Sequence, residues 1–261
     1  MENTAFDFDK TVRDLKKNRI ELDFDLIAQN YDEIYQNVTK AAGFPVGYVY
    51  EHKASEIHRA LSGRPGFPSA PVILDFGCGI GIIDPYLRKY FPDSSIYGVD
   101  TSAESIRLAK GRNGALNISY AVIDESRDDF PFEVQFDLVY VSGVFHHIAR
   151  RDHLSVFARI KALLKPGGLL FAQEPNPYNP AVQILVFHKY DKQFDPNAKM
   201  LRPYYMRNQM KKAGLAPLRT CYEIFFPAFL SALLPLEKHM RFLPLGARYY
   251  VIAESGKSGA R

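Results

Sequence analysis

The sequence predicts an α/β fold in which helices cover both faces of a mainly parallel sheet. From Val72 onwards, short apolar runs alternate with segments of helical periodicity, which is typical of such a sheet. The first run, Val72–Phe76, leads directly into a glycine-rich turn and then into a helical segment. A strand, a glycine turn and a helix start together form a cradle for a nucleotide.

The expected elements follow one another at short intervals. Strands are predicted at 72–76, 95–99, 118–123, 136–141 and 169–173. Helices are predicted between them at about 82–90, 102–110 and 153–164. The tail adds a helix at 203–213 and strands at 218–226 and 248–253. Right-handed crossovers bring the carboxyl ends of parallel strands to one rim of the sheet, where we expect ligands to bind.

The N-terminal part is predicted to form a helical cap. Apolar residues recur at helical spacing between Phe24 and Tyr35, and a second helix is expected at 48–61. A linker rich in Gly and Pro follows at 62–71. We therefore predict a cap over residues 1–69 and a sheet domain over residues 70–261.

The glycine spacing indicates which nucleotide binds. The dinucleotide fingerprint G-x-G-x-x-G needs its third glycine at the position of Ile82, but the chain has Gly77, Gly79 and Gly81. Asp75 stands two residues before the first glycine, and its carboxylate would repel a pyrophosphate. The pattern favours a positively charged nucleoside over NAD, although a glycine turn without a ligand stays an alternative.

Two more acids stand at strand ends. Asp100 ends the second strand, where a carboxylate accepts hydrogen bonds from both ribose hydroxyls. Its alternative role is to cap the helix that starts near Ser102. Asp124 ends the third strand and would accept from an adenine amine or lie in a solvated turn.

Four motifs occur in order along the chain: Ile73–Gly81, Tyr97–Asp100, Phe136–Ile148 and Leu164–Leu170. Together they resemble the class I S-adenosylmethionine (SAM) methyltransferases, of the type that includes the ubiquinone and menaquinone C-methyltransferases. Residues 24–32 resemble the helical entry segment of that group. The resemblance implies a Rossmann-like sheet of seven strands, with strands six and seven formed by the tail.

The resemblance also implies SAM as methyl donor and S-adenosylhomocysteine as product. The implied cofactor contacts lie in the glycine turn and at strand ends. They are Asp75, Gly77, Cys78, Gly79 and Gly81 for the methionine side, Asp100 and Thr101 for ribose, Asp124 and Glu125 for adenine, and Ser142 and Gly143 near the sulfonium. Tyr31 of the cap is expected to close over the cofactor and the substrate pocket.

Methyl transfer mainly needs a nucleophile that is held close to the sulfonium and aligned with it. His146 and His147 follow the fourth strand, and an imidazole can accept a proton near neutral pH. These two residues are the catalytic candidates. Their alternative role is to orient backbone or to pack under the next helix.

Acceptor-binding candidates lie after the fifth strand. Glu174 and Asn176 stand in a loop stiffened by three prolines, which suits hydrogen bonding to a substrate or a solvated connection. Arg202 and Tyr204 belong to a basic run and would bind an anionic group of the acceptor, or form a solvated helix face. The loop departs from the quinone enzymes' pattern, so it does not indicate a quinone acceptor.

The composition limits the kinds of binding partner and the cellular location that we expect for this protein. The net charge of +4 is mild and does not indicate a nucleic-acid partner, and no Cys/His spacing indicates a metal. Two cysteines, no leader-like start and no apolar run of membrane-spanning length make the cytoplasm the expected location. The apolar insert at about 225–246 is interpreted as a buried hairpin most simply, or else as a lid, a dimer surface or a peripheral membrane contact.

The sequence thus predicts SAM-dependent methyl transfer to a small-molecule or lipid-like, including lipid-linked, acceptor. Two alternatives stay open, an NAD-dependent oxidoreductase and a SAM-binding module without catalysis. Neither the acceptor atom (carbon, oxygen or nitrogen) nor the oligomeric state follows from the sequence.

Overall fold

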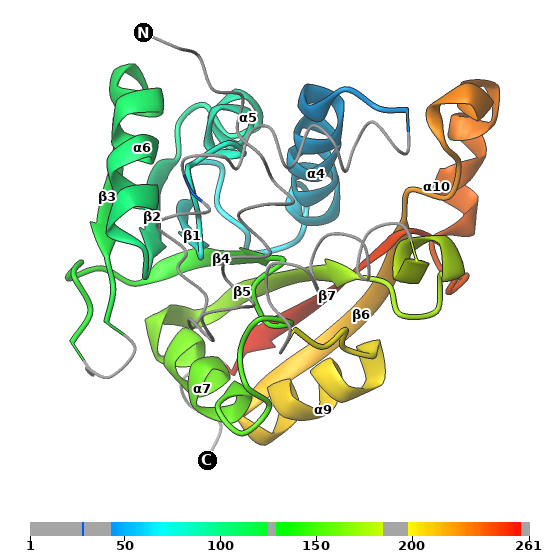
Figure 1. Cartoon of the computed structure of the whole chain (residues 1–261). Coiled ribbons are helices and arrows are strands. Elements are labelled where there is room, and N and C mark those ends of the chain that lie inside the picture. The colour runs from blue at the N-terminus through cyan, green and yellow to red at the C-terminus, as the bar shows by residue number, and fades with distance from the viewer. Residues whose placement is uncertain (1–27, 29–42, 125–128, 185–197, 257–261) are drawn as a thin grey trace, which may run out of the picture.

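A computed structural model describes residues 28, 43–124, 129–184 and 198–256. Its centre is a seven-stranded sheet with the order β3-β2-β1-β4-β5-β7-β6 (Figure 1). The strands are β1 (Val72–Phe76), β2 (Ser95–Asp100), β3 (Ile118–Val122), β4 (Phe136–Ser142), β5 (Leu164–Pro175), β6 (Leu215–Glu223) and β7 (Arg248–Ser255). Strands β1 to β5 are parallel, and β7 runs antiparallel between β5 and β6. The predicted mainly parallel α/β sheet of seven strands is confirmed.

Helices cover both faces of this sheet. Figure 1 shows α4 (Val46–Leu61), α5 (Asp84–Tyr90) and α6 (Ala103–Asn113) on one side, and α7 (His153–Leu163) and α9 (Pro203–Lys212) on the other. None of the helices in the described part of the chain has the length and apolar character needed to cross a membrane.

Alternate residues of each central strand pack into opposite layers. Ile73 of β1 lies in one apolar cluster with Ile57 of α4, whereas its neighbour Leu74 lies in a second cluster with Phe157 of α7 and Met206 of α9. Because both faces are buried, the strands appear in the sequence as continuous apolar runs.

Helix α4 shares its core with the sheet. Ala54, Ile57 and Leu61 are fully buried in the same cluster as residues of β1, β4, β5 and β7. The rest of the predicted cap, apart from Ala28, lies outside the described residues. The domain boundary at residues 69 and 70 stays a prediction.

Two strands differ from the prediction by three or more residues at an end, and four others differ by one or two residues. β5 begins at Leu164 rather than at residue 169, because Leu164 already pairs with Phe136 before a register shift. β6 covers residues 215–223 rather than 218–226, because Leu215 pairs with Ser255 directly after Gly214, whose φ of 79° ends the preceding helix.

The expectation of a buried hairpin in the insert is wrong. The segment forms a 3₁₀ helix, η3 (Ala228–Leu236), and a short helix, α10 (Glu237–Met240). Pro235 lies inside η3, and a proline cannot donate a ladder hydrogen bond. Phe229 and Phe242 are 82% and 74% exposed, so much of the insert's apolar surface faces outwards.

Replacement of Gly168 and of Gly111 by alanine should change the stability of the protein in opposite directions. A Cβ at Gly168 would lie 2.8 Å from the carbonyl oxygen of Phe136, so Gly168→Ala should lower the free energy of unfolding by about 1–3 kcal/mol. A Cβ at Gly111, inside α6, would meet no atom within 4 Å, so Gly111→Ala should raise it by about 0.5–1 kcal/mol. Urea unfolding measures both changes, and the same sign for the two variants would contradict this packing.

Candidate functional site

The glycine turn joins β1 to α5 at the carboxyl rim of the sheet. Gly77, Gly79 and Gly81 have φ values of 76°, 52° and 68°, which L side chains rarely adopt. A Cβ at Gly77 would collide with the side chain of Val144, and one at Gly81 would lie 2.6 Å from Nδ2 of Asn113. A Cβ at Gly79 would meet no atom within 4 Å. Packing therefore explains the outer two glycines, while the backbone at Gly79 faces open space that a ligand can enter.

Asp100 ties this turn to the end of β2. Its Oδ2 accepts a hydrogen bond from the Gly79 amide at 2.8 Å, and its Oδ1 accepts from the Ser102 amide at 3.0 Å. The hydroxyl of Ser102 caps α6 by accepting from the Ser105 amide. A carboxylate has about four acceptor positions, so these two bonds are compatible with the predicted ribose contact.

Two buried carboxyl groups lie beside the turn. Asp75 is 3% exposed, and burial, followed by the charge of Asp84, raises its pKa well above the ordinary value. Burial also raises the pKa of Asp84 to about 6, although Tyr120, whose hydroxyl donates to Oδ2 of Asp84 at 2.5 Å, counteracts this. A ligand cation would offset the charge of these acids, which agrees with the predicted preference for a cationic nucleoside.

A pocket of about 60 Å³ adjoins these acids. Residues of α4, the turn and β4 line it, among them Tyr50, Lys53, Asp75, Gly77, Cys78 and Ser142. This volume is below the roughly 300 Å³ of a typical small-molecule site, so the pocket would hold one end of SAM, with the remainder along the rim towards Asp100. The residues present fit the cofactor in charge and in backbone access.

Lys53 is a site residue that sequence reasoning missed. It is 5% exposed on α4, and its Nζ donates to Oγ of Ser142 at 3.2 Å. Burial, and then the charge of Arg248, lower its pKa well below the ordinary value. The available signal was a lysine within the apolar pattern of the helix, between Tyr50 and Ile57.

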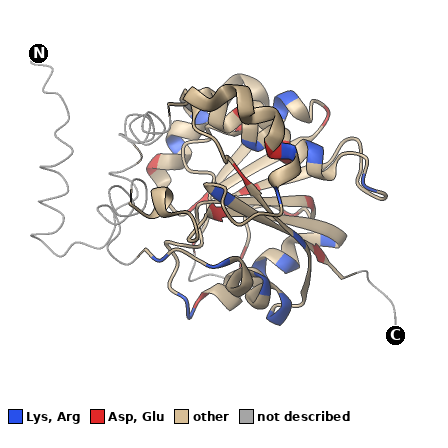
Figure 2. Ribbon diagram, turned by 90° about the vertical axis from the view of Figure 1, so that its right-hand side faces the viewer, with Lys and Arg blue, Asp and Glu red and all other residues tan. Residues whose placement is uncertain are grey.

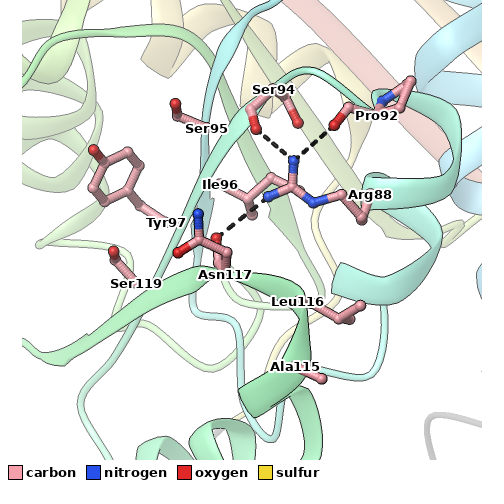
Figure 3. Close-up of a pocket in the computed structure, with 10 residues that line it drawn as sticks. All are labelled: Arg88, Pro92, Ser94, Ser95, Ile96, Tyr97, Ala115, Leu116, Asn117 and Ser119. Carbon is pink, nitrogen blue, oxygen red and sulfur yellow. Dashed lines mark hydrogen bonds between the residues drawn. The ribbon is translucent and has the colours of Figure 1, made fainter.

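A larger cavity of about 420 Å³ opens at the opposite rim, between the starts of β2 and β3 (Figure 3). Arg88 lies in it and donates to the carbonyl oxygens of Pro92, Ser94 and Asn117 at 3.1, 2.5 and 3.4 Å. Ligands of open α/β sheets bind outside the carboxyl ends of the strands, so this cavity is on the wrong side for the cofactor.

Glu174 and Asn176 are buried and hold other parts of the protein. Glu174 accepts from the Phe145 amide at 2.9 Å, and its other oxygen lies 2.7 Å from Nδ1 of His146. Nδ2 of Asn176 donates to the carbonyl oxygens of Pro244 and Gly246. These contacts favour a bracing role over the predicted contact with an acceptor.

The catalytic candidates lie just beyond β4. His146 is 5% exposed, and its ring centre lies 4.0 Å from that of His147. Gly143 has a φ of 70° and its amide donates to the Gln173 carbonyl at 3.0 Å, which fixes the backbone before these residues. Whether either histidine accepts a proton stays a prediction.

The remaining candidates are not gathered in the pocket. Arg202 and Tyr204 are exposed at the start of α9, Tyr204 by 79%, and neither lines the pocket at the glycine turn. Figure 2 shows Lys and Arg on helices of both layers, without confinement to one of them. Thr101 and Asp124 are exposed at the rim, while Tyr31 and Glu125 lie outside the described residues.

Comparison with known proteins agrees with this geometry. Residues 73–168 match the model of a methyltransferase domain. The chain is 38% identical over 110 residues to ribosomal RNA large subunit methyltransferase G of Shewanella amazonensis. This alignment covers 38% of this chain and 27% of that protein. It is 28% identical over 193 residues to a ubiquinone biosynthesis O-methyltransferase of Cereibacter sphaeroides, covering 70% and 75%. The chain spans about half or less of the length of several other curated relatives.

Among solved structures, magnesium protoporphyrin IX methyltransferase of Synechocystis PCC 6803, solved with bound S-adenosylhomocysteine, superposes with a TM-score of 0.59. The match covers 89% of this chain and 97% of that one at 14% identity, so it shows the shared fold. Residues 73–168, which include the glycine turn, thus match a methyltransferase domain within the seven-stranded α/β sheet. In sequence and in fold the chain is similar to SAM-dependent methyltransferases, and this similarity supports SAM as the cofactor.

Substitution of Gly79 should separate cofactor binding from backbone strain. Gly79→Val and the control Gly63→Val both place a branched residue at a positive φ in open space, so each should destabilise the fold by about 1–3 kcal/mol. Only Gly79→Val should weaken S-adenosylhomocysteine binding, by about tenfold or more, in calorimetry. Asp100→Ala should weaken it as well. Wild-type affinity in both Gly79→Val and Asp100→Ala would contradict this placement of the cofactor.

Asp84→Asn should change how stability depends on pH. An unfolded aspartate ionises near pH 3.8, whereas folded Asp84 keeps its proton up to about pH 6. The folded state binds more protons in this window, so Asp84 lowers the free energy of unfolding as the pH rises. Relative to wild type, the variant should gain about 2 kcal/mol from pH 4 to pH 6 in urea unfolding. A constant difference between the two proteins would contradict the raised pKa.

Proposed function

We propose that this protein transfers a methyl group from SAM to a small-molecule or lipid-like acceptor. The observation that carries the proposal is the open backbone at Gly79, between the buried acids Asp75 and Asp84 on one side and Asp100 on the other. SAM supplies an activated methyl group when it is bound. The turn would hold the methionine end, Asp75 would favour its ammonium group, and Asp100 would accept from the ribose.

The acceptor proposal draws on the relatives and on the insert. The relative aligned over most of its length is named for ubiquinone biosynthesis, whereas the ribosomal RNA enzyme aligns over 27% of its length. The insert exposes a group of large apolar side chains: Phe229, Leu230, Leu233, Leu236, Phe242 and Leu245. Such a surface suits contact with an apolar acceptor or with a membrane surface.

The chain's own residues would position the acceptor and move its proton. We propose that His146, whose ring is held by Glu174, helps to position the acceptor, and we propose His147 as the alternative for this role. We also propose a cytoplasmic location, in keeping with Cys78 and Cys221, which are free thiols.

Turnover of methyl-labelled SAM tests the function. The protein should transfer label to a component of a protein-free extract, in the small-molecule or lipid fraction rather than in the RNA fraction. S-adenosylhomocysteine binding without any transfer would favour the SAM-binding module. NADH binding without S-adenosylhomocysteine binding would favour the oxidoreductase and overturn the proposal.

A further inference from the structure

Two buried polar atoms face each other between α4 and the end of β6. Glu223 ends β6 and is 2% exposed, and its Oε1 accepts a hydrogen bond from Nε2 of Gln173. Its Oε2 has no hydrogen-bond partner within the described residues, and neither has Nε2 of His52 on α4. These two atoms are 3.7 Å apart, which is too far for a direct hydrogen bond. Buried polar atoms are normally hydrogen-bonded, so a small polar group placed between these two atoms would satisfy both of them, in addition to their ionic contact.

Side-chain hydrogen bonds connect this pair to the cofactor pocket. The side-chain amide of Gln173 bonds two residues. Its Nε2 donates to Oε1 of Glu223, and its Oε1 accepts a hydrogen bond from Oγ of Ser142 at 3.0 Å. Oγ of Ser142 in turn accepts from Nζ of Lys53 at 3.2 Å. Ser142 and Lys53 line the pocket at the glycine turn. Two hydrogen bonds therefore connect Glu223, through Gln173, to Ser142, the residue expected near the sulfonium.

The pair fits a hydroxyl group. An oxygen atom can lie about 2.8 Å from both atoms of a pair with this separation. A hydroxyl can donate to one partner and accept from the other, whichever of Glu223 and His52 holds the shared proton. Its oxygen has a second lone pair with which to attack, whereas an amine nitrogen that accepts a hydrogen bond has none left.

The charges around Glu223 come from two elements besides its own strand. His52, Lys53 and Glu56 face it from α4, and Arg248 faces it from β7. Burial raises the pKa of Glu223, the charge of Glu56 adds to this, and His52, Arg248 and Lys53 oppose it. A buried carboxylate with a raised pKa is a suitable proton acceptor near neutral pH.

Resting on the proposed function, we propose that Glu223 and His52 bind a hydroxyl group of the acceptor and that Glu223 takes its proton during O-methyl transfer. The acceptor oxygen forms a bond to the methyl carbon while the bond from that carbon to sulfur breaks. The electron pair of the broken bond stays on sulfur, which yields S-adenosylhomocysteine. The hydroxyl proton moves to Oε2 of Glu223, so atoms and charge balance.

The test compares Glu223→Gln with Glu254→Gln, the same change on β7. The probe is SAM with a ¹³C-labelled methyl group, supplied with the protein-free extract. Glu223→Gln should keep S-adenosylhomocysteine affinity within about twofold by calorimetry and lose about 10²- to 10⁴-fold in transfer rate. It should also lose the acidic limb of the pH–rate profile, while Glu254→Gln should match wild type. His52→Asn should lower the rate as well, and the ¹³C shift of the product should identify a methyl group on oxygen.

Several results would overturn the inference. A wild-type rate in Glu223→Gln would mean that the pair holds only a water molecule. An unchanged pH profile with a reduced rate would indicate a structural role. A product methylated on nitrogen or carbon would exclude the hydroxyl acceptor. A wild-type protein that binds no S-adenosylhomocysteine would overturn the proposed function together with this inference.

Discussion

The hydrogen bonds between the glycine turn and the end of β2 are the constraint on which the rest of the site depends. The amides of Gly77 and Cys78 donate to the Val99 carbonyl, and the amide of Gly79 donates to Asp100. These bonds use the amides of a turn whose positive φ angles favour glycine. They hold the backbone of the turn against β2, with the open side at Gly79 directed away from protein atoms.

Buried charge is the second feature of this rim. Lys53, Asp75, Glu174 and Glu223 are all 5% exposed or less, and an uncompensated buried charge costs free energy. The hydrogen bonds of Lys53 to Ser142, of Glu174 to His146 and of Glu223 to Gln173 offset part of this cost. A protein with such a site is expected to gain stability when a cofactor of matching charge binds, because binding to the folded state alone shifts the folding equilibrium.

The sheet and the cofactor half of the site could be predicted because each depends on local sequence. Glycine spacing, an acid at a strand end and an apolar run of five residues are all readable within a short window. The hydrogen-bonded chain from Lys53 to Glu223 could not be predicted, because its members come from α4, β4, β5 and β6 and meet only through strand order. The insert was misjudged for a related reason. Its apolar composition indicates burial, but Pro227 and Pro235 prevent the paired strands that burial would need.

The position of β7 has a consequence for how the chain reaches this structure. β7 follows β6 in sequence but lies between β5 and β6, with pairs to both. Until it is synthesised and inserted, β5 has an open edge and β6 has no neighbour in the sheet. Glu223 and Arg248 meet in the same step, because they are register partners at the end of the β6–β7 ladder. The parallel half can therefore form on the ribosome first, while the acceptor side of the rim is assembled by a late, non-local step. A ribosome-bound chain that ends before β7 should expose the unpaired backbone edge of β5, which is a site for aggregation or for chaperone binding.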